Sequence, residues 1–352
     1  MAGTILQVAA EQGSDLLLLG DSGANVITDE KELKQSSIDR LRLYEDVHGV
    51  FTRPIPAAVV MARSTQHVAE VLRFANKSRI NVVARTGRTA TEGGLETAVA
   101  NSIVLDGSGM NGILKIDTYN MQATVQCGVC LQTLEDEVRK HGLTTGHSPQ
   151  SKPIAQLGGL VATRSIGQFS TLYGGIEDMV VGLEAVFADG TVTRIKNVPR
   201  RAVGPDIRHV VIGNEGALCY ITEVTVKLFP YLPQNNTFVG YTLKNMRTGF
   251  EALRKVMVEG YRPSVARLPD VAVVGEHAEG PRHLAEVLAV VVHLLGAFIE
   301  VKVPEHVGQD EAEEQDPRDG HHRLLPYRRT VEVEKPESRP HTPLSQRLWA
   351  AR

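Results

Sequence analysis

One glycine-rich stretch, residues 158–192, constrains the fold of this chain more than any other segment. It opens with the pair Gly158-Gly159, passes Gly167 and reaches a Tyr-Gly-Gly turn at 173–175. Because glycine has no Cβ, such positions let a ligand or a second segment approach the backbone closely. A strand expected at 180–188 follows and ends in an Asp-Gly hairpin turn. The stretch therefore predicts a glycine-lined surface that suits a large, flat cofactor.

The composition favours a globular protein that acts on small molecules. The chain has 352 residues, of which 42% are hydrophobic and 22% charged, with a formal net charge of -3. Its length corresponds to about two domains. A small negative charge gives no electrostatic basis for binding nucleic acid or an anionic membrane, so neither is an expected partner.

Neither a targeting segment nor a membrane span is expected. Residues 1–15 lack a basic region followed by a sustained apolar core, which argues against a signal peptide. The longest apolar run, 287–299, is shorter than the roughly 20 residues that cross a bilayer. The three cysteines are too few for a secreted disulfide framework. Together these features predict a cytoplasmic protein.

Hydrophobic periodicity predicts alternating strands and helices. Ser64 is expected to begin a helix whose Val68, Val71 and Ala75 share one face. With the strands on either side of it, this helix forms a β-α-β unit. Expected strands lie at 54–63, 81–85, 102–105, 113–117, 121–126, 180–188, 191–195, 220–228 and 264–268, and expected helices at 31–43, 131–140 and from 245 onward.

Two loops are candidates for ligand binding. The loop 86–95 is rich in glycine and small hydroxyl residues, so its backbone N–H groups can converge on an anion such as a diphosphate. By itself the loop is equally consistent with a flexible turn. The loop 213–216 places two glycines before a strand, which indicates close backbone approach by the same ligand. No GxxxxGK[ST] motif occurs, which argues against a P-loop.

A CxxC motif, Cys127 to Cys130, stands at the expected start of the helix 131–140. Thiols at a helix start can serve redox exchange or half of a zinc site. The sequence holds no second CxxC or CxxH, so we interpret these cysteines as two half-buried small residues and predict no metal site.

Three segments, residues 85–94, 148–193 and 213–230, together carry a family resemblance. In this order they resemble the FAD-binding domain of the FAD-linked oxidase family, whose members include vanillyl-alcohol oxidase and p-cresol methylhydroxylase. The nearest similarity is to the alkylglycerone-phosphate synthase branch. The resemblance implies an α+β fold, in which two α+β subdomains of a p-cresol methylhydroxylase-type FAD-binding domain grip FAD and a cap domain holds the substrate.

The resemblance also implies the residues that bind FAD. The pyrophosphate would be cradled by Arg85, Thr86, Gly87, Thr89, Gly93 and Gly94. The ADP and flavin would be lined by Pro149, Gly158, Gly159, Thr163, Gly167, Tyr173 and Gly174. The far side would be closed by Glu215, Gly216 and Ile221. The first loop departs from the family's run of glycines at Thr86, Arg88 and Ala90. It holds no histidine for a covalent link, so non-covalent FAD is expected.

Arg267 stands where the synthase branch keeps an arginine that resembles a substrate-contacting residue. A guanidinium there suits a carboxylate or phosphate. An exposed arginine on a strand is an equally good interpretation, and no catalytic residue is assigned.

The character of the chain changes after residue 270. Residues 309–319 form a dense acidic run, and the end of the chain lacks apolar periodicity, so disorder is expected there. We expect a C-terminal region that is truncated or irregular, in which the family's cap domain is not recognisable. The predicted organisation is 1–53, an N-terminal approach segment; 54–232, the FAD-binding domain; 233–270, the start of the substrate or cap domain; and 271–352, an atypical tail.

The expected function is oxidation of a small hydroxy acid or alcohol by hydride transfer to flavin. The expected partners are that small-molecule substrate and an electron acceptor. Two alternatives stay open: a transferase that uses FAD as alkylglycerone-phosphate synthase does, and a non-catalytic flavin-binding fragment without its cap domain.

Overall fold

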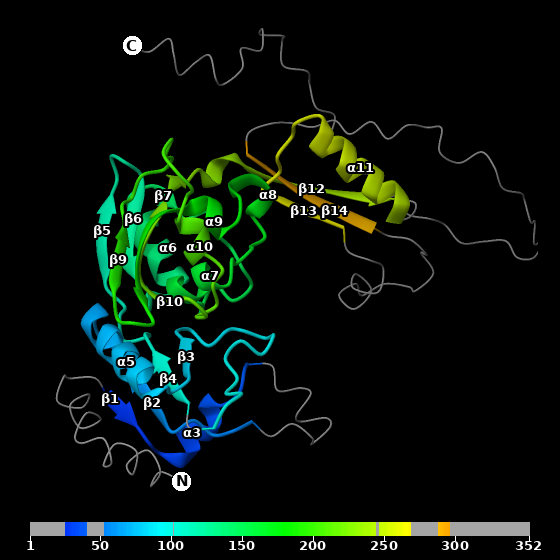
Figure 1. Ribbon diagram of the computed structural model, residues 1–352. Helices are drawn as coiled ribbons and strands as arrows, with labels where there is room; N and C mark the ends of the chain where they lie inside the picture. Colours follow the sequence, from blue (N-terminus) through cyan, green and yellow to red (C-terminus); the bar gives the residue numbers. More distant parts are fainter. Residues whose placement is uncertain (1–24, 41–52, 101, 244–245, 269–287, 296–352) are drawn as a thin grey trace, which may run out of the picture. The chain divides into compact units, whose positions relative to one another are not determined.

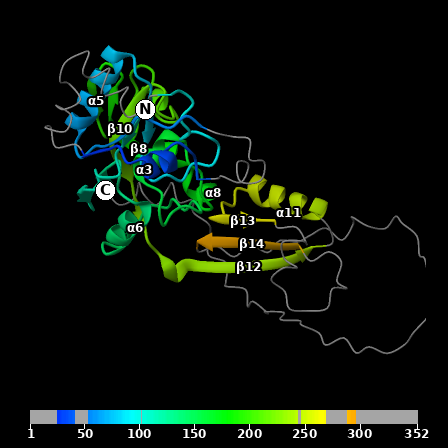
Figure 2. The same cartoon turned by 90° about the horizontal axis from the view of Figure 1, so that it is seen from below.

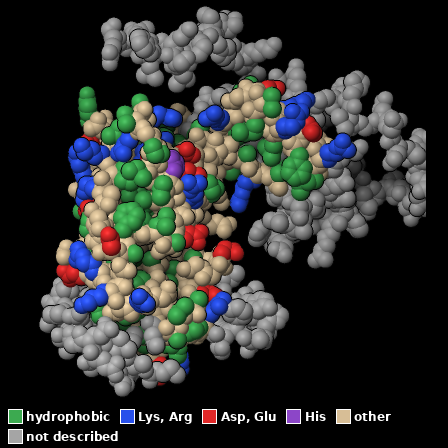
Figure 3. Space-filling model, viewed as in Figure 1, with side chains coloured by type: hydrophobic (Ala, Val, Ile, Leu, Met, Phe, Trp, Pro, Cys, Tyr) green, Lys and Arg blue, Asp and Glu red, His purple; other side chains and the backbone are tan. Residues whose placement is uncertain are grey.

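The structure is a computed structural model that describes residues 25–40, 53–100, 102–243, 246–268 and 288–295 (Figure 1). Most of the expected tail 271–352 and much of the segment 1–53 lie outside these residues. Among the described residues, no helix has the length and apolar character that a membrane crossing requires. On the face drawn in Figure 3, basic and acidic side chains both occur over the described surface.

The N-terminal part is a four-stranded sheet in the order β1-β2-β4-β3. Its strands are β1 (Asn25–Ile27), β2 (Ala58–Met61), β3 (Val82–Arg85) and β4 (Ile103–Asp106), and its helices are α3 (Glu30–Ser36) and α5 (Thr65–Ser78). Both β2 and β3 pair in parallel with β4, while β1 pairs antiparallel with β2. The β-α-β unit is therefore present, with β4 inserted between its two strands.

Helix α5 forms where the sequence predicts it. The Ser64 hydroxyl accepts a hydrogen bond from the His67 N–H at 3.2 Å, which satisfies one of the free donors of the first turn. At the other end Arg79 adopts the left-handed conformation, with φ of 54°. The buried face of α5 includes Val68 and Val71, which share an apolar cluster with residues of β2 and β4.

The central part is a five-stranded antiparallel sheet in the order β5-β6-β10-β8-β9. Its strands are β5 (Ile113–Asp117), β6 (Gln122–Gln126), β8 (Val180–Phe187), β9 (Val192–Ile195) and β10 (Cys219–Lys227). Helices α6 (Leu131–Arg139), α7 (Leu157–Ala162), α9 (Ile176–Met179) and α10 (Arg208–Val211) bury their apolar residues in one core with it (Figure 1). The short elements are α8 (Ser170–Tyr173), β7 (Leu143–Thr144), β11 (Phe229–Pro230) and the 3-10 helix Pro233–Asn235.

Polar and apolar contacts join these two sheets. The Tyr220 hydroxyl, on β10, donates to the Arg85 carbonyl at the end of β3, at 2.8 Å. The Thr65 hydroxyl, at the start of α5, donates to the Glu184 carboxylate on β8, at 2.7 Å. Cys127 packs in the same apolar cluster as β2, β4 and α5. The end of β3 is thus held against β10, and the loop that follows β3 starts from a fixed position.

A third sheet, in the order β12-β14-β13, follows in the sequence. Its strands are β12 (Asn236–Leu243), β13 (Val265–Arg267) and β14 (Leu288–Leu295), and helix α11 (Met246–Val258) packs on it (Figure 2). Residues 288–295 of the apolar run that the sequence showed form the central strand of this sheet. Strand β13 contacts α8, which brings its end near the glycine-rich stretch.

Candidate functional site

Three segments that are far apart in the sequence line one cavity of about 420 Å³. They are the loop after β3, helix α7 with the residues before it, and the turn that leads into β10. The predicted cofactor residues that line it are Arg85, Thr86, Gly87, Thr89, Gly94, Pro149, Gly158, Gly159, Thr163, Glu215, Gly216 and Ile221. The three sequence segments that carried the family resemblance therefore meet in space.

Four predicted residues lie elsewhere among the described residues. The Gly93 N–H donates to the Asp39 carboxylate at 2.7 Å, and Gly167 lines a neighbouring cavity. Tyr173 packs on Phe229, with ring centroids 4.6 Å apart, and Gly174 makes the turn that follows with φ of 88°. The geometry thus gives Tyr173 and Gly174 a packing and turn role outside the 420 Å³ cavity.

The Gly158-Gly159 pair lies within helix α7, not on the flat surface that the sequence suggested. A Cβ on Gly158 would lie 2.5 Å from the Cβ of Cys127, so this glycine allows α7 to pack against the chain itself. A Cβ on Gly159 would meet only the Thr86 hydroxyl, at 2.9 Å, on the cavity side. Only the second glycine therefore keeps cavity space free.

The two cysteines of the CxxC motif lie in different surroundings. Cys127 is fully buried, and burial raises the pKa of its thiol far above the usual range. The Cys130 thiol donates to the Pro153 carbonyl at 3.1 Å. The interpretation as half-buried small residues fits Cys130, which is partly exposed, whereas Cys127 is fully buried.

Two polar atoms in the cavity wall have no protein partner among the described residues. They are the Thr86 hydroxyl oxygen and the Gln156 carboxamide oxygen, and both are buried. Buried polar groups almost always form hydrogen bonds, so two unsatisfied groups in residues that line one cavity are consistent with a ligand that has polar groups. This observation, with the space that Gly159 leaves, fits a nucleotide cofactor such as FAD.

The segment after α3 anchors the loop 86–95, which the sequence analysis did not foresee. Asp39 is buried and accepts the Gly93 N–H, and the Arg40 N–H donates to the Ala90 carbonyl at 3.2 Å. The Arg88 guanidinium donates to the Gln35 carbonyl at 2.7 Å. Arg88 and Ala90, two residues of this loop, therefore help to tie it down.

The turn before β10 is organised by one side chain, Asn214. Its carboxamide oxygen accepts the Gly216 N–H at 3.0 Å, and its nitrogen donates to the Val211 carbonyl at 2.6 Å. The Glu215 N–H then donates to the Ala162 carbonyl of α7 at 3.0 Å. These bonds fix the two sides of the cavity to each other.

Arg85 forms a buried ion pair with Asp106, its parallel-strand neighbour on β4. Arg85 Nε lies 2.6 Å from Asp106 Oδ2, and both side chains are almost fully buried. Because this nitrogen is engaged with a carboxylate, Arg85 stiffens the cavity floor.

A second cavity, of about 830 Å³, adjoins the first. Both are lined by Thr89, Pro149, Ser151 and Ile166. Arg267, the candidate substrate contact, lines the second cavity only. The structure thus places it beside the loop predicted to hold the cofactor.

Comparison with known proteins shows what the chain is similar to. The FAD binding domain family matches residues 56–196. An FAD-linked oxidoreductase of Escherichia coli (strain K12), YgcU, is 69% identical over 252 residues, which cover 72% of this chain and 52% of that protein. The chain carries the FAD-binding domain of the FAD-linked oxidoreductases. It spans about half the length of this relative.

More distant relatives include alkyldihydroxyacetonephosphate synthase of Caenorhabditis elegans, 33% identical over 61% of this chain and 36% of that protein. The D-lactate dehydrogenase [cytochrome] 1 of Saccharomyces cerevisiae is 31% identical over 52% of this chain and 32% of that protein. A solved structure of an alkyldihydroxyacetonephosphate synthase aligns with a TM-score of 0.67 at 24% identity, covering 77% of this chain and 53% of that one. This match confirms the predicted α+β fold.

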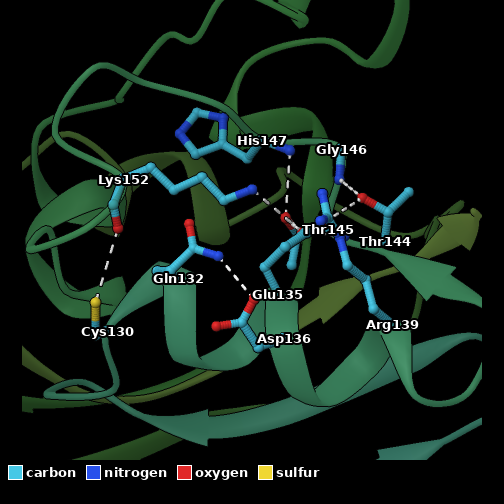
Figure 4. A network of polar contacts seen from close by, with 10 residues as sticks. All are labelled: Cys130, Gln132, Glu135, Asp136, Arg139, Thr144, Thr145, Gly146, His147 and Lys152. Carbon is cyan, nitrogen blue, oxygen red and sulfur yellow. Dashed lines mark hydrogen bonds and ion pairs between the residues drawn. The ribbon is translucent and has the colours of Figure 1, made fainter. Parts of the chain in front are cut away.

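A buried carboxylate organises the FAD-binding domain behind the cavity (Figure 4). Glu135 of α6 accepts hydrogen bonds from the Thr145 hydroxyl at 2.6 Å and from Arg139 Nε at 2.8 Å, and Lys152 Nζ lies 3.7 Å away. Burial alone would raise the pKa of Glu135, but the hydrogen bonds from Thr145 and the charge of Lys152 outweigh burial and lower this pKa. The network fixes the segment 144–152, which leads to the cavity wall.

His147 lies in the same segment of the FAD-binding domain and is buried. Its Nε2 lies 3.1 Å from the hydroxyl of Ser165, which lines the cavity, while its Nδ1 has no partner within the described part of the chain. Burial first, and then the charge of Lys152, lower its pKa to about 4. His147 is therefore a neutral imidazole at physiological pH, and the sequence analysis had not singled it out.

Proposed function

We propose that this chain binds FAD non-covalently in the 420 Å³ cavity and serves the oxidation of a small hydroxy acid or alcohol. The observation that carries the cofactor site is the pair of unsatisfied polar atoms, Thr86 Oγ1 and Gln156 Oε1, in the wall of one cavity. We take residues 54–232 as the FAD-binding domain and 233–270 as the start of the substrate domain. The tail 271–352 keeps its proposed atypical character.

The cavity wall favours non-covalent binding. Its described lining contains no histidine, and its one cysteine, Cys219, has a pKa that burial raises to about 11. The Tyr220 hydroxyl donates to the Arg85 carbonyl, and burial raises its pKa well above the usual value. A protonated thiol and phenol are poor nucleophiles, so neither is suited to forming a bond to flavin.

The residues of the chain would orient and shield the cofactor. The loop 86–94, tied down through Gly93, would present backbone N–H groups to the pyrophosphate. Thr86 and Gln156 would supply hydrogen bonds, and the turn at Glu215 and Gly216 would exclude water from the far side. When bound, FAD supplies the two-electron acceptor for a hydride from the substrate carbon.

The substrate would occupy the adjoining cavity. The Arg267 guanidinium there suits a carboxylate, and the name of the yeast relative, D-lactate dehydrogenase, is that of an enzyme acting on a hydroxy acid. We propose that an external electron acceptor then takes the electrons.

Two alternatives have specific support. The similarity to alkyldihydroxyacetonephosphate synthase favours an FAD-dependent transferase, in which Arg267 would face a phosphate. The irregular sequence after residue 270, with its acidic run at 309–319, is the feature that favours a non-catalytic flavin-binding fragment. Reconstitution with FAD and anaerobic mixing with a panel of hydroxy acids distinguishes the proposed oxidation from both alternatives. Bleaching of the flavin supports oxidation, yellow protein that never bleaches supports the fragment or the transferase, and colourless protein refutes FAD binding.

Gly159→Val tests the position of the cofactor. Its branched side chain would project into the cavity beside Thr86, so we expect loss of FAD from the purified protein. Ala202→Val is the control, because Ala202 is exposed and lies outside the cavity lining. If the folded Gly159→Val variant held FAD as tightly as the parent, the proposed cofactor position would be wrong.

A further inference from the structure

The 830 Å³ cavity has a one-sided charge. Two arginines, Arg40 and Arg267, line it, and no carboxylate does so among the described residues. Within the same part of the chain, neither guanidinium forms an ion pair. The rest of the lining is uncharged and includes the carboxamides of Gln150 and Gln168. Guanidinium and carboxamide groups together are suited to an anion.

The two arginines reach this cavity from separate elements. Arg267 ends β13, which contacts α8. Arg40 follows α3, and its backbone is fixed because its N–H donates to the Ala90 carbonyl and the preceding Asp39 accepts the Gly93 N–H. The anchor of Arg40 is therefore the same loop that lines both cavities.

Two like charges brought to one cavity repel each other unless an anion lies between them. A monoanion would neutralise only one guanidinium, whereas a dianion would neutralise both. Each arginine can bind a carboxylate or phosphate with paired hydrogen bonds. The cavity volume is also within the range of sites for ligands larger than a two- or three-carbon acid.

We propose that Arg40 is a second specificity-determining residue and that the substrate of the proposed function is a dianion held jointly by Arg40 and Arg267. The oxidised substrate is then an acid that carries a second carboxylate or a phosphate. That the bound dianion is the oxidised substrate rests on the proposed function. Binding of the dianion itself can be measured without turnover.

Calorimetric titration of the full chain loaded with FAD tests the proposal. The probes are succinate, inorganic phosphate and acetate, at a fixed ionic strength near 0.15 M so that exposed charges are screened. We expect succinate or phosphate to bind at least about tenfold more tightly than acetate. Tighter binding of succinate would indicate that the second anionic group of the substrate is a carboxylate, and tighter binding of phosphate would indicate a phosphate. Arg40→Gln and Arg267→Gln should each weaken dianion binding by about tenfold or more.

Arg254→Gln is the matched control, because Arg254 is exposed on α11 and pairs with Glu251 at the surface. Equal binding of acetate and the dianions, or dianion binding by Arg40→Gln at the parent's affinity, would overturn the proposal. Loss of FAD from Arg40→Gln would also overturn it, since the side chain would then act on the cofactor loop. If the parent itself retained no FAD, the proposed function would fail, and titration of the cofactor-free chain would still decide the role of Arg40.

Discussion

The buried His147 predicts a loss of stability at mildly acidic pH. Its side chain is only 2% exposed, and its Nδ1 finds no acceptor or donor within the described residues. The positive charge of Lys152 disfavours a second positive charge on His147. Protonating His147 in the folded state is therefore unfavourable, and burial with Lys152 lowers its pKa from 6.5 to about 4.

The sign of the effect follows from proton linkage. The unfolded chain binds a proton at the ordinary pKa and the folded chain does not, so stability is fully present above pH 6.5 and falls as the pH drops toward 4. At about 1.36 kcal/mol for each pKa unit, the whole effect is about 3 kcal/mol. Between pH 7 and pH 5 the loss of stability is about 2 kcal/mol, which is a substantial part of a total free energy of unfolding of about 5–15 kcal/mol.

Urea unfolding of the FAD-free chain, followed by circular dichroism at pH 7 and 5, measures this loss. His147→Gln keeps a polar side chain beside Ser165 but cannot be protonated, so its loss between the two pH values should be smaller by about 2 kcal/mol. His141→Gln, at an exposed position, should keep the parent's pH dependence. The pKa of Glu135 is lowered from 4.5, so its protonation changes the stability below that pH, outside the range from pH 7 to pH 5. Identical pH dependence in the parent and His147→Gln would refute the reasoning.

Two further variants test the supports of the cavity. Glu135→Gln should lower the free energy of unfolding by about 2 kcal/mol in the same urea titration, because Arg139 and Lys152 lose a buried charged partner. Glu137→Gln is the control: Glu137 belongs to an exposed ion pair, so the free energy of unfolding should change by less than about 0.5 kcal/mol. Asp39→Ala should weaken FAD binding by about tenfold in a fluorescence titration, because the Gly93 N–H loses its acceptor. Asp29→Ala removes the N-cap of α3 instead and should leave FAD affinity unchanged; equal effects of the two would contradict the anchoring role of Asp39.

Local sequence signals predicted much of the fold. The Ser64 cap and the spacing of Val68, Val71 and Ala75 located α5, because capping and helical periodicity depend on residues close in sequence. The strand order could not be read in the same way. The parallel pairing that inserts β4 between β2 and β3 is a long-range contact with no local signature.

The glycine pattern located the site but not the role of each glycine. A missing Cβ signals close approach, and the sequence does not say whether a ligand or the protein approaches. At Gly158 the neighbour is Cys127, at Gly167 it is the backbone of 148–149, and only at Gly159 does the missing Cβ leave space beside Thr86. This ambiguity also concealed α7, whose six residues are too few to show helical periodicity.

The anchoring of the loop 86–95 links the two halves of the proposed site. Asp39 and Arg40 hold this loop across more than fifty positions of sequence, so no local pattern could have indicated them. The same loop supplies Thr86 to the 420 Å³ cavity and Thr89 to both cavities. A shift of the loop would therefore move the wall of the cofactor cavity and the backbone of Arg40 together. On the proposals made above, retention of FAD and preference for a dianionic substrate depend on the same few backbone hydrogen bonds.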